Sequence, residues 1–397
     1  MDGNFGYLLT KKTMNMKHKT AIIIGAGVGG LCTALGLRKI GIAATVYERA
    51  GILGDVGAGL VIAANAIRSL RRIGLGDEAV AAGSKLHLTQ IRASNGDVLA
   101  STDMSSYESL FSAPTIAIHR AALHKVLMDA LPASYIKLGA PCIRVEQDEE
   151  GVTAQFEDGS EARAEFLIGA DGVRSIIRRQ FFPSIELRYS GYTAWRGAVT
   201  SRDEVALGIT SETWGRGNRF GIIRMDADRI YWFATANTKQ GVTYAPDEQK
   251  KVLLDIFGSW HHPVKHLIES TPADVILHND ISDFAPMSQW SVGRITLLGD
   301  AAHATTPNMG QGACMAIESA DVLAQCLSKN DDIVSAFKEY ETRRKPRTAF
   351  VTDRSWQIGR VAQWENPLAC AVRNFAVKTF SSHMMTKQLS KILGAES

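Results

Sequence analysis

The sequence lacks the features of a secreted, metal-binding or membrane-spanning protein. Its 397 residues include only five cysteines, and these form no Cys-x-x-Cys pair or other metal-ligand spacing: Cys32, Cys142, Cys314, Cys326 and Cys370. An odd and scattered set indicates reduced thiols in the cytoplasm rather than a disulfide framework. No apolar run approaches the roughly 20 residues that span a bilayer. No membrane span and no metal site is therefore predicted.

The sequence also lacks an excess of one charge. There are 44 Lys and Arg against 41 Asp and Glu, a formal net charge of +3, without a dense basic stripe. Nucleic acid is therefore not an expected partner. Internal repeats and low-complexity linkers are absent too, and residues 1–18 contain no apolar segment of signal-peptide length, so we interpret them as a flexible leader. With 45% apolar residues, the composition is that of a globular protein.

A glycine-rich turn follows the first predicted strand. The apolar run Ala21–Ile24 leads into Gly25–Gly30, after which apolar residues recur at helical spacing, and a second strand ends at Glu48. Such a turn lets a pyrophosphate approach the backbone and the helix N-terminus, while an acid about 20 residues further on accepts hydrogen bonds from a ribose. A ligand-free turn with a solvated Glu48 is the alternative. The predicted dinucleotide contacts are Gly25, Gly27, Gly30, Glu48 and the adjacent Arg49.

Two more acidic turns follow predicted buried strands. Asp171-Gly172 comes after the strand at 164–168, and Gly299-Asp300 comes after the strand at 294–298. Asp300 can accept hydrogen bonds from ribityl or ribose hydroxyls, whereas a role as a turn or helix cap is the alternative. Backbone N–H groups at the next helix start can stabilise negative charge on a reduced flavin ring. These groups belong to Gly310, Gln311 and Gly312. Together the three turns indicate a flavin enzyme rather than a simple dehydrogenase.

The residues between these turns are β-rich and aromatic. We predict an α/β fold in which a Rossmann-type FAD-binding domain (19–85, 114–186 and 285–345) is interrupted by a β-rich substrate domain (86–113 and 187–284), with C-terminal helices at 346–397. A β-hairpin arm is predicted at 144–156, with 157–160 as its turn. A buried arginine in the insertion would favour a phenolate or carboxylate substrate. Candidate substrate contacts are Tyr192, Arg196, Arg219, Trp232 and Met309, although aromatic residues on strands can equally be core.

The motifs resemble those of the single-component FAD-dependent aromatic hydroxylases, the group A flavoprotein monooxygenases with the p-hydroxybenzoate hydroxylase fold. The resemblance runs from about Lys19 to Arg347. Gly191–Gly197 (GYTAWRG) is typical of the branch that holds salicylate, 3-hydroxybenzoate and urate hydroxylases and zeaxanthin epoxidase-like enzymes. Two positions depart from the family pattern, because Cys314 stands where many members have Asn and Ser319 where many have Asp.

This resemblance implies bound FAD, transient NAD(P)H, and O2. The activity it implies is oxygen transfer from a flavin C4a-hydroperoxide to a small aromatic or conjugated substrate. It also implies further cofactor contacts at Gly59, Arg120, Asp171 and Pro307. The chemistry is carried by the flavin, so the catalytic side chain stays unknown, with Arg196, Arg219 and Tyr192 as candidates. His303 is interpreted as a structural residue. The expected state is a monomer or a homodimer.

Other functions stay open at this point. An NAD-dependent dehydrogenase would not need the Gly299-Asp300 turn, and a flavin-dependent halogenase would carry a W-x-W-x-I-P segment that is missing. A non-catalytic flavin-binding sensor or scaffold remains, as does a quinone-pathway hydroxylase at a membrane surface. The segment 367–380 is expected to be an amphipathic helix packed on the body, with membrane-surface contact as its second possible use.

Overall fold

A six-stranded sheet forms the centre of the nucleotide-binding part. This computed structural model describes residues 19–52, 59–200 and 204–393, and for 380–391 it describes the backbone alone. The predicted leader lies outside the described residues. The strands are parallel except at the β18 edge. In spatial order they are β18 (Ser291–Val292), β19 (Ile295–Leu297), β12 (Phe166–Gly169), β1 (Thr20–Ile24), β2 (Ala43–Glu48) and β8 (Ile136–Leu138).

Helix α2 (Val28–Lys39) follows β1 directly and has a buried stretch from Gly30 to Leu37, because its apolar residues lie between the sheet and α11 (Gly312–Lys329). Helix α11 also packs on α3 (Ala64–Ile73) and α12 (Ile333–Ala362). The remaining helices of this part are shorter: α4 (Gly76–Ala81), α5 (Ser105–Phe111), α6 (Arg120–Asp129), α7 (Ile176–Phe181) and α10 (Asp300–His303), with 3-10 turns η1 (Ala133–Tyr135) and η3 (Pro307–Met309).

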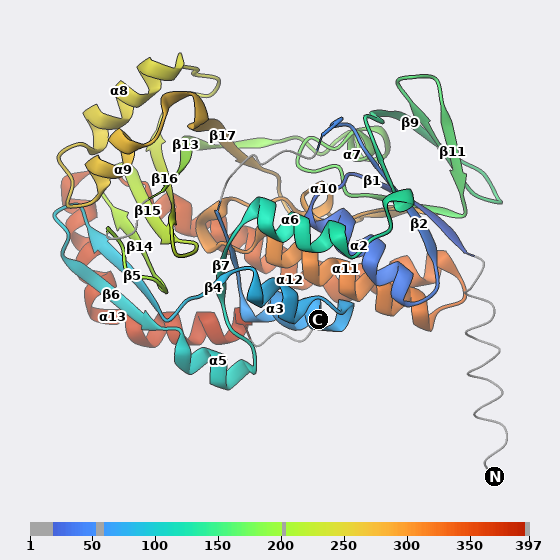
Figure 1. The fold of residues 1–397 in the computed structure, drawn as a ribbon, viewed down its shortest axis with the longest axis horizontal. Helices are drawn as coiled ribbons and strands as arrows, with labels where there is room; N and C mark the ends of the chain where they lie inside the picture. The colour runs from blue at the N-terminus through green and yellow to red at the C-terminus, as the bar shows by residue number, and fades with distance from the viewer. Residues whose placement is uncertain (1–18, 53–58, 201–203, 394–397) are drawn as a thin grey trace, which may run out of the picture.

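A seven-stranded sheet lies at the other end of the molecule (Figure 1). Its strands come from both inserted segments of the chain, and all neighbours are antiparallel except β14 and β5. In spatial order they are β17 (Leu277–Asp283), β13 (Arg188–Thr200), β16 (Arg229–Asn237), β15 (Asn218–Arg224), β14 (Ile209–Trp214), β5 (Leu88–Ala93) and β6 (Val98–Asp103).

The two faces of this sheet carry different side chains, because successive residues of a strand point to opposite sides. Trp195, Phe220 and Trp232 pack in one core with residues of α8 (Pro246–Phe257) and α9 (Val264–Ser270), beside the 3-10 turn η2 (Ala273–Val275). Tyr231, whose ring lies against Gly59, belongs to the opposite face, which covers the small sheet of β3 (Gly59–Ile62), β7 (Ile116–His119) and β4 (Ser84–Lys85).

The predicted hairpin arm is a three-stranded meander instead. Strand β9 (Cys142–Gln147) pairs with β10 (Val152–Phe156), which pairs with β11 (Glu161–Ala164). Residues 157–160 therefore connect β10 to β11, whereas 148–151 make the first turn. Both turns are set by aspartates that accept backbone N–H groups two residues on, Asp148 from Glu150 and Asp158 from Ser160. The prediction placed the second turn correctly but missed the first, which carries the same chemistry.

The chain ends in α12 and α13 (Pro367–Leu393), as expected from its sequence. Figure 1 shows α13, in red, along the outer edge of the molecule, and it packs against β6 and α3. Within the described part of the chain, no helix combines the length and apolar character that crossing a bilayer requires.

Candidate functional site

The three glycine- and acid-containing turns meet at one edge of the six-stranded sheet. Because β1, β2, β12 and β19 are parallel, their carboxyl ends lie side by side, which is where α/β sheets bind ligands. Gly25 N–H donates to Tyr47 O (2.8 Å), and Ala170 N–H donates to Ile24 O (2.8 Å). On the far side, Leu298 N–H donates to Gly169 O (2.9 Å). Turns from three distant parts of the sequence thus share one site.

In the first turn, Gly25 has no room for a side chain, whereas the space beside Gly27 is open. Gly25 has φ +104°, and a Cβ there would collide with the carbonyl oxygen of Ala170. Around Gly27, by contrast, a Cβ would meet no atom within 4 Å. Gly27 therefore borders open space directly at the N-terminus of the 12-residue helix α2, where free N–H groups and the helix dipole favour a phosphate.

Glu48 is held in a fixed orientation at the end of β2. Its Oε2 accepts from Ala26 N–H (2.8 Å), and its Oε1 accepts from Ala50 N–H (2.9 Å). Each oxygen keeps a second lone pair, and the side chain is half-buried, so the carboxylate can also accept from a hydroxyl. The neighbouring Arg49 is exposed.

Asp171 and Arg178 connect the second turn to the third. One Asp171 oxygen, Oδ2, accepts from Ile176 N–H (2.7 Å) at the start of α7, while the buried Oδ1 has no hydrogen-bond partner among the described residues. Burial raises the pKa of Asp171. The buried Arg178 donates to Ala301 O (3.2 Å) and Val173 O (2.6 Å), and it lies 4.4 Å from the Phe284 ring centre. This arginine fixes the two acidic turns relative to each other.

Asp300 has the properties of a group that lines a deep cleft. Its side chain is exposed, yet enough protein surrounds the carboxyl group to raise its pKa by desolvation, against the opposing effect of Arg120 and Arg178. Arg120, at the start of α6, is itself exposed. The open space at Gly27, the unpartnered Asp171 oxygen and the accessible Asp300 together fit a ligand with phosphates and hydroxyls, as FAD has.

The turn η3 and the start of α11 form the other wall of the site. Pro307 and Gly310 are exposed, and Gly310 has φ +61° with no atom within 4 Å of a Cβ position. Helix α11 begins at Gly312 and is 18 residues long, so its N-terminus supplies N–H groups and a positive dipole end. Cys314 Sγ, at the family's Asn position, accepts from Ala63 N–H (3.4 Å). The thiol thereby links α11 to the β3–α3 connection.

Arg219 is buried beneath this wall and already has partners. Its Nη2 donates to Asn308 Oδ1 (2.7 Å), its Nη1 donates to Glu212 Oε1 (2.9 Å), and its Nε donates to Gln363 Oε1 (2.9 Å). Asn308 Nδ2 lies 3.0 Å from the hydroxyl of Tyr192. The structure therefore brings Tyr192 and Arg219 together beside η3, which also carries the half-buried Met309. The charge of Arg219, however, is balanced by Glu212.

Trp232 does not share this face, which corrects its selection as a substrate contact. It is fully buried, donates through Nε1 to Thr271 Oγ1 (2.9 Å) and stacks on Phe220. Arg219 pairs with Thr235 across the strands, so odd-numbered residues of β16 share its face and even-numbered ones do not. Tyr231 and Phe233 lie on the Arg219 face instead, as counting in twos from Thr235 shows.

Arg196 lies on the same face as Tyr231 and Phe233, because it pairs with Phe233 across β13 and β16. It is half-buried and donates to Asn279 Oδ1 (3.4 Å). Burial raises the pKa of the Tyr231 hydroxyl, and the charge of Arg196 opposes this rise. Asn308, Glu212 and Gln363 were also not predicted, since nothing in their sequence context marks them. Their role is visible only from the partners that the fold gives to Arg219.

His303 is a buried structural residue. Its Nε2 lies 3.0 Å from Ser319 Oγ, the serine at the family's Asp position, and Ser319 also accepts from Arg344 Nε (3.1 Å). Burial, together with the nearby Arg344, lowers the pKa of His303 to about 3. The imidazole is therefore neutral at physiological pH and bonded within the core.

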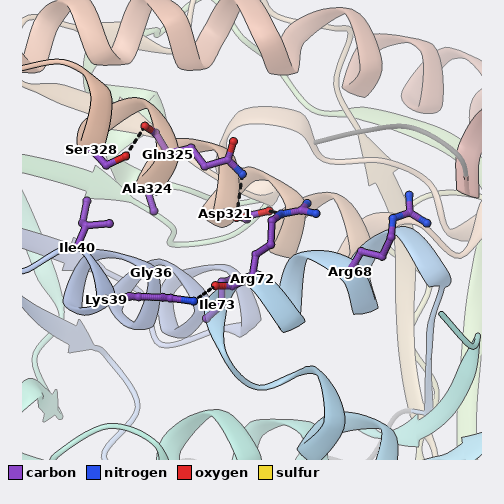
Figure 2. Close-up of a pocket in the computed structure, with 10 residues that line it drawn as sticks. All are labelled: Gly36, Lys39, Ile40, Arg68, Arg72, Ile73, Asp321, Ala324, Gln325 and Ser328. Atoms are coloured by element: carbon purple, nitrogen blue, oxygen red, sulfur yellow. Dashed lines mark hydrogen bonds and ion pairs between the residues drawn. The ribbon is translucent and has the colours of Figure 1, made fainter. Parts of the chain in front are cut away.

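A surface hollow of about 670 Å³ between α2, α3 and α11 is separate from this site (Figure 2). It is bordered by the C-terminal end of α2, from Gly36 to Ile40. The N-terminus of α2, where a phosphate is proposed to bind, is at Val28, about 15 Å away at 1.5 Å per residue. In the hollow Arg72 forms an ion pair with Asp321 (2.6 Å), and Gln325 donates to the same carboxylate. These groups join α3 to α11, and Lys39 Nζ of α2 donates to Arg72 O.

Comparisons with known proteins agree with this geometry. A family model described as "FAD binding domain" matches residues 18–355. Aurachin C monooxygenase/isomerase of Stigmatella aurantiaca is 40% identical over 91% of this chain and 94% of its own length. The 2-heptyl-3-hydroxy-4(1H)-quinolone synthase of Pseudomonas aeruginosa is 34% identical over 90% and 94%. Klebsiella pneumoniae HpxO, solved with FAD and uric acid, matches with TM-score 0.89 and 28% identity over 95% and 97%. The predicted fold class is confirmed.

Proposed function

Because the chain belongs to the FAD binding domain family and is an FAD-dependent monooxygenase of the aromatic hydroxylase type, we propose that it hydroxylates a neutral heteroaromatic ring of the quinolone kind. One relative is named for the synthesis of 2-heptyl-3-hydroxy-4(1H)-quinolone, a compound that contains such a ring. It aligns with 90% of this chain. The proposed substrate enters between the odd-numbered face of the seven-stranded sheet and the turn η3.

The observation that carries this proposal is the ion pair of Arg219 and Glu212, with 2.9 Å between Nη1 and Oε1. From sequence, a buried arginine in the insertion favoured a carboxylate or phenolate substrate. In the fold, the arginine has an internal carboxylate, and an added substrate carboxylate would meet Glu212 as a like charge. Phe233 and Met309, both half-buried, offer apolar surface on this side instead. A neutral aromatic ring suits such a surface.

The residues at the sheet edge are proposed to hold FAD. When bound, FAD accepts a hydride from NAD(P)H and activates O2. The N–H groups near Gly27 and the N-terminus of α2 bind the pyrophosphate, with Arg120 beside it. Glu48 and Asp300 accept from the ribose and ribityl hydroxyls, and Asp171, through Arg178, orients the third turn. The N-terminus of α11, at Gly310–Gly312, stabilises negative charge at the ring edge.

The division of labour follows the sheets. We assign cofactor binding to 19–85, 114–186 and 285–345 and substrate binding to 86–113 and 187–284, because strands of the latter two segments form one sheet. Tyr192, Arg196 and Arg219 are proposed to shape the substrate side, and none of them is assigned a proton-transfer step. NAD(P)H visits transiently, and five unpaired cysteines support a cytoplasmic location.

The experiment measures NAD(P)H oxidation by the FAD-loaded protein with 2-heptyl-4(1H)-quinolone, urate and salicylate, together with ¹⁸O incorporation from ¹⁸O₂ into the product. We expect the quinolone to exceed salicylate at least about tenfold in kcat/KM, a difference of about 1.4 kcal/mol. A preference for urate or salicylate would refute the quinolone assignment. The absence of stimulated oxidation with all three would leave the substrate outside these ring classes.

A substitution tests the charge argument directly. Glu212→Gln removes the carboxylate that balances Arg219 while keeping a hydrogen-bond acceptor. The ratio of kcat/KM for salicylate to that for the quinolone should therefore rise in this variant. Asp97→Asn, on the exposed turn between β5 and β6, is the matched control and should leave the ratio unchanged.

A further inference from the structure

Helix α13 exposes an apolar stripe along its first three turns. Leu368, Val372 and Phe375, spaced by four and three residues, are 79%, 66% and 68% exposed. The opposite side carries Arg373, which is 3% exposed. Its guanidinium donates to Ala362 O (2.8 Å) and Gly215 O (2.8 Å) and lies 5.3 Å from the Trp214 ring centre. Surface helices normally bury the apolar stripe and expose the arginine.

Two further exposed apolar residues directly precede α13 in the chain, one in the last turn of α12 and one in the α12–α13 connection. Val361 and Trp364 are each more than a third exposed, and Trp364 O accepts from Cys370 Sγ (3.1 Å), which holds the α12–α13 connection against the helix. Single exposed apolar residues are common on soluble proteins, whereas a contiguous set in helical register marks an interaction surface. We call this surface the α13 face: Val361, Trp364, Leu368, Val372 and Phe375.

The charge around the α13 face is mostly positive, and the exposed Glu365 is the one acid in the sequence from 361 to 393. From Pro367 to Leu393 the sequence contains Arg373, Lys378, Lys387 and Lys391 but no Asp or Glu, although acids and bases nearly balance in the whole chain. Lys378 is exposed, and so is Arg360 one residue before Val361. A second copy of this chain would bring like charges together, so the charge pattern disfavours self-association. It complements a negatively charged surface.

We propose that the α13 face binds the surface of an anionic lipid bilayer, with the helix lying in the plane of the interface. An apolar helical stripe edged by lysine and arginine, with a tryptophan at its border, has the composition of interfacial helices. Leu368, Val372 and Phe375 would enter the headgroup–acyl boundary, while Lys378 and Arg360 would contact lipid phosphates. Polybasic flanks of this kind add attraction to anionic lipids.

The position of the α13 face adds a consequence for substrate delivery. A surface groove of about 520 Å³ beside it is lined by Trp364, Arg360 and Gln363. Gln363 accepts from Arg219 Nε, and Arg219 bonds to Asn308 in the turn η3. Two buried residues, Gln363 and Arg219, thus lie between the groove and the proposed substrate side. The delivery of an alkyl-tailed ring from the bilayer rests on the proposed function, whereas the lipid contact does not.

The test is sedimentation of the full-length, FAD-loaded protein with large vesicles of phosphatidylcholine alone or mixed with an equal part of phosphatidylglycerol. We expect binding to the mixed vesicles, weakened by salt, and little binding to the neutral ones. Leu368→Ser combined with Phe375→Ser should lower the partition coefficient by about tenfold or more, because two apolar side chains that would enter the bilayer are removed. Ile143→Ser, at a similarly exposed apolar residue on β9, should not change it.

No substrate enters this measurement, so its result is independent of the quinolone assignment. Equal binding of wild type and double variant, or equal binding to both vesicle types, would overturn the proposal. So would a dimer in sedimentation velocity that the double variant abolishes, because the face would then join two copies. If the double variant fails to fold, Lys378→Glu provides the second measurement and should reduce binding to the mixed vesicles alone.

Discussion

Arg219 and Asn308 are joined by a 2.7 Å hydrogen bond that connects the seven-stranded sheet to the turn η3. Asn308 also donates to Ser355 O (2.9 Å) of α12, and its amide fills the position that a Cβ at Gly359 would need. One buried contact therefore links the proposed substrate side, the flavin-side turn and the long helix α12. The proposed substrate side and the proposed cofactor side are therefore separated by residues from both parts of the fold.

A double-mutant cycle on this pair should show strong coupling. Arg219→Ala and Asn308→Ala each remove a partner of a buried polar group, and the double variant should be less destabilised than the sum of the two by about 1–3 kcal/mol. Urea unfolding at pH 7 measures it. The exposed pair Arg163 and Asp148 is the control, with an expected coupling below about 1 kcal/mol. Additive losses at Arg219 and Asn308 would show that the two elements are held together elsewhere.

Asp300→Ala should weaken FAD binding without unfolding the protein. The substitution leaves a cofactor hydroxyl without its proposed acceptor, a loss of about 1–3 kcal/mol, or about tenfold or more in Kd. Glu48→Ala should weaken binding similarly and also release Ala26 N–H. Flavin fluorescence during titration gives the Kd. Asp129→Ala, on the exposed side of α6, serves as control, and an unchanged Kd in Asp300→Ala would mean that the third turn has another role.

Stability should decrease as the pH falls below about 6.5, because of His303. Burial lowers its pKa to about 3 in the folded protein, while the unfolded chain titrates near 6.5. Between these values the unfolded state binds more protons, so each pH unit of acidification costs about 1.4 kcal/mol from this residue. Urea unfolding from pH 7.5 to 4.5 should show a steeper decline for wild type than for His303→Asn. Parallel curves would mean that the imidazole is protonated in the core.

Glu318→Gln should lower the free energy of unfolding by more than the loss of an exposed ion pair does. Glu318 is fully buried and lies 2.9 Å from Arg344 Nη2 and 2.6 Å from Arg347 Nη2. These arginines hold the pKa of Glu318 at about 2, so the charged network is intact above about pH 4.5 and is lost as the pH falls toward 2. Removing the carboxylate charge leaves Arg344 buried without its counter-ion, at a cost of about 3–5 kcal/mol.

The measurement for this prediction is the free energy of unfolding at pH 7. Its matched control is Asp129→Asn in the exposed pair with Lys125, where the loss should stay within about 1 kcal/mol. A small loss in Glu318→Gln would indicate that Asn65, which also donates to this carboxylate (2.7 Å), and the two arginines rearrange around the neutral amide.

The proposed cofactor side follows from local sequence. A strand, a tight glycine turn and a helix are adjacent in the chain, so Gly25, Gly27 and Glu48 could be assigned from spacing alone, and the fold class followed. The same holds for Asp171 and Asp300, each of which comes directly after a buried strand. Parallel strands place their carboxyl ends at one edge, which is why motifs far apart in sequence could be expected to meet.

The substrate side and the outer surface were decided only by tertiary structure. Whether Trp232 or Tyr231 lies on the same face of the sheet as Arg219 depends on strand register, and a shift of one residue reverses every side chain. The partners of Arg219 come from β14, η3 and α12, so its charge balance cannot be inferred from its neighbours in sequence. The outward direction of Phe375 and the inward direction of Arg373 likewise depend on which side of α13 packs on the body, because the helical pattern alone fits either orientation.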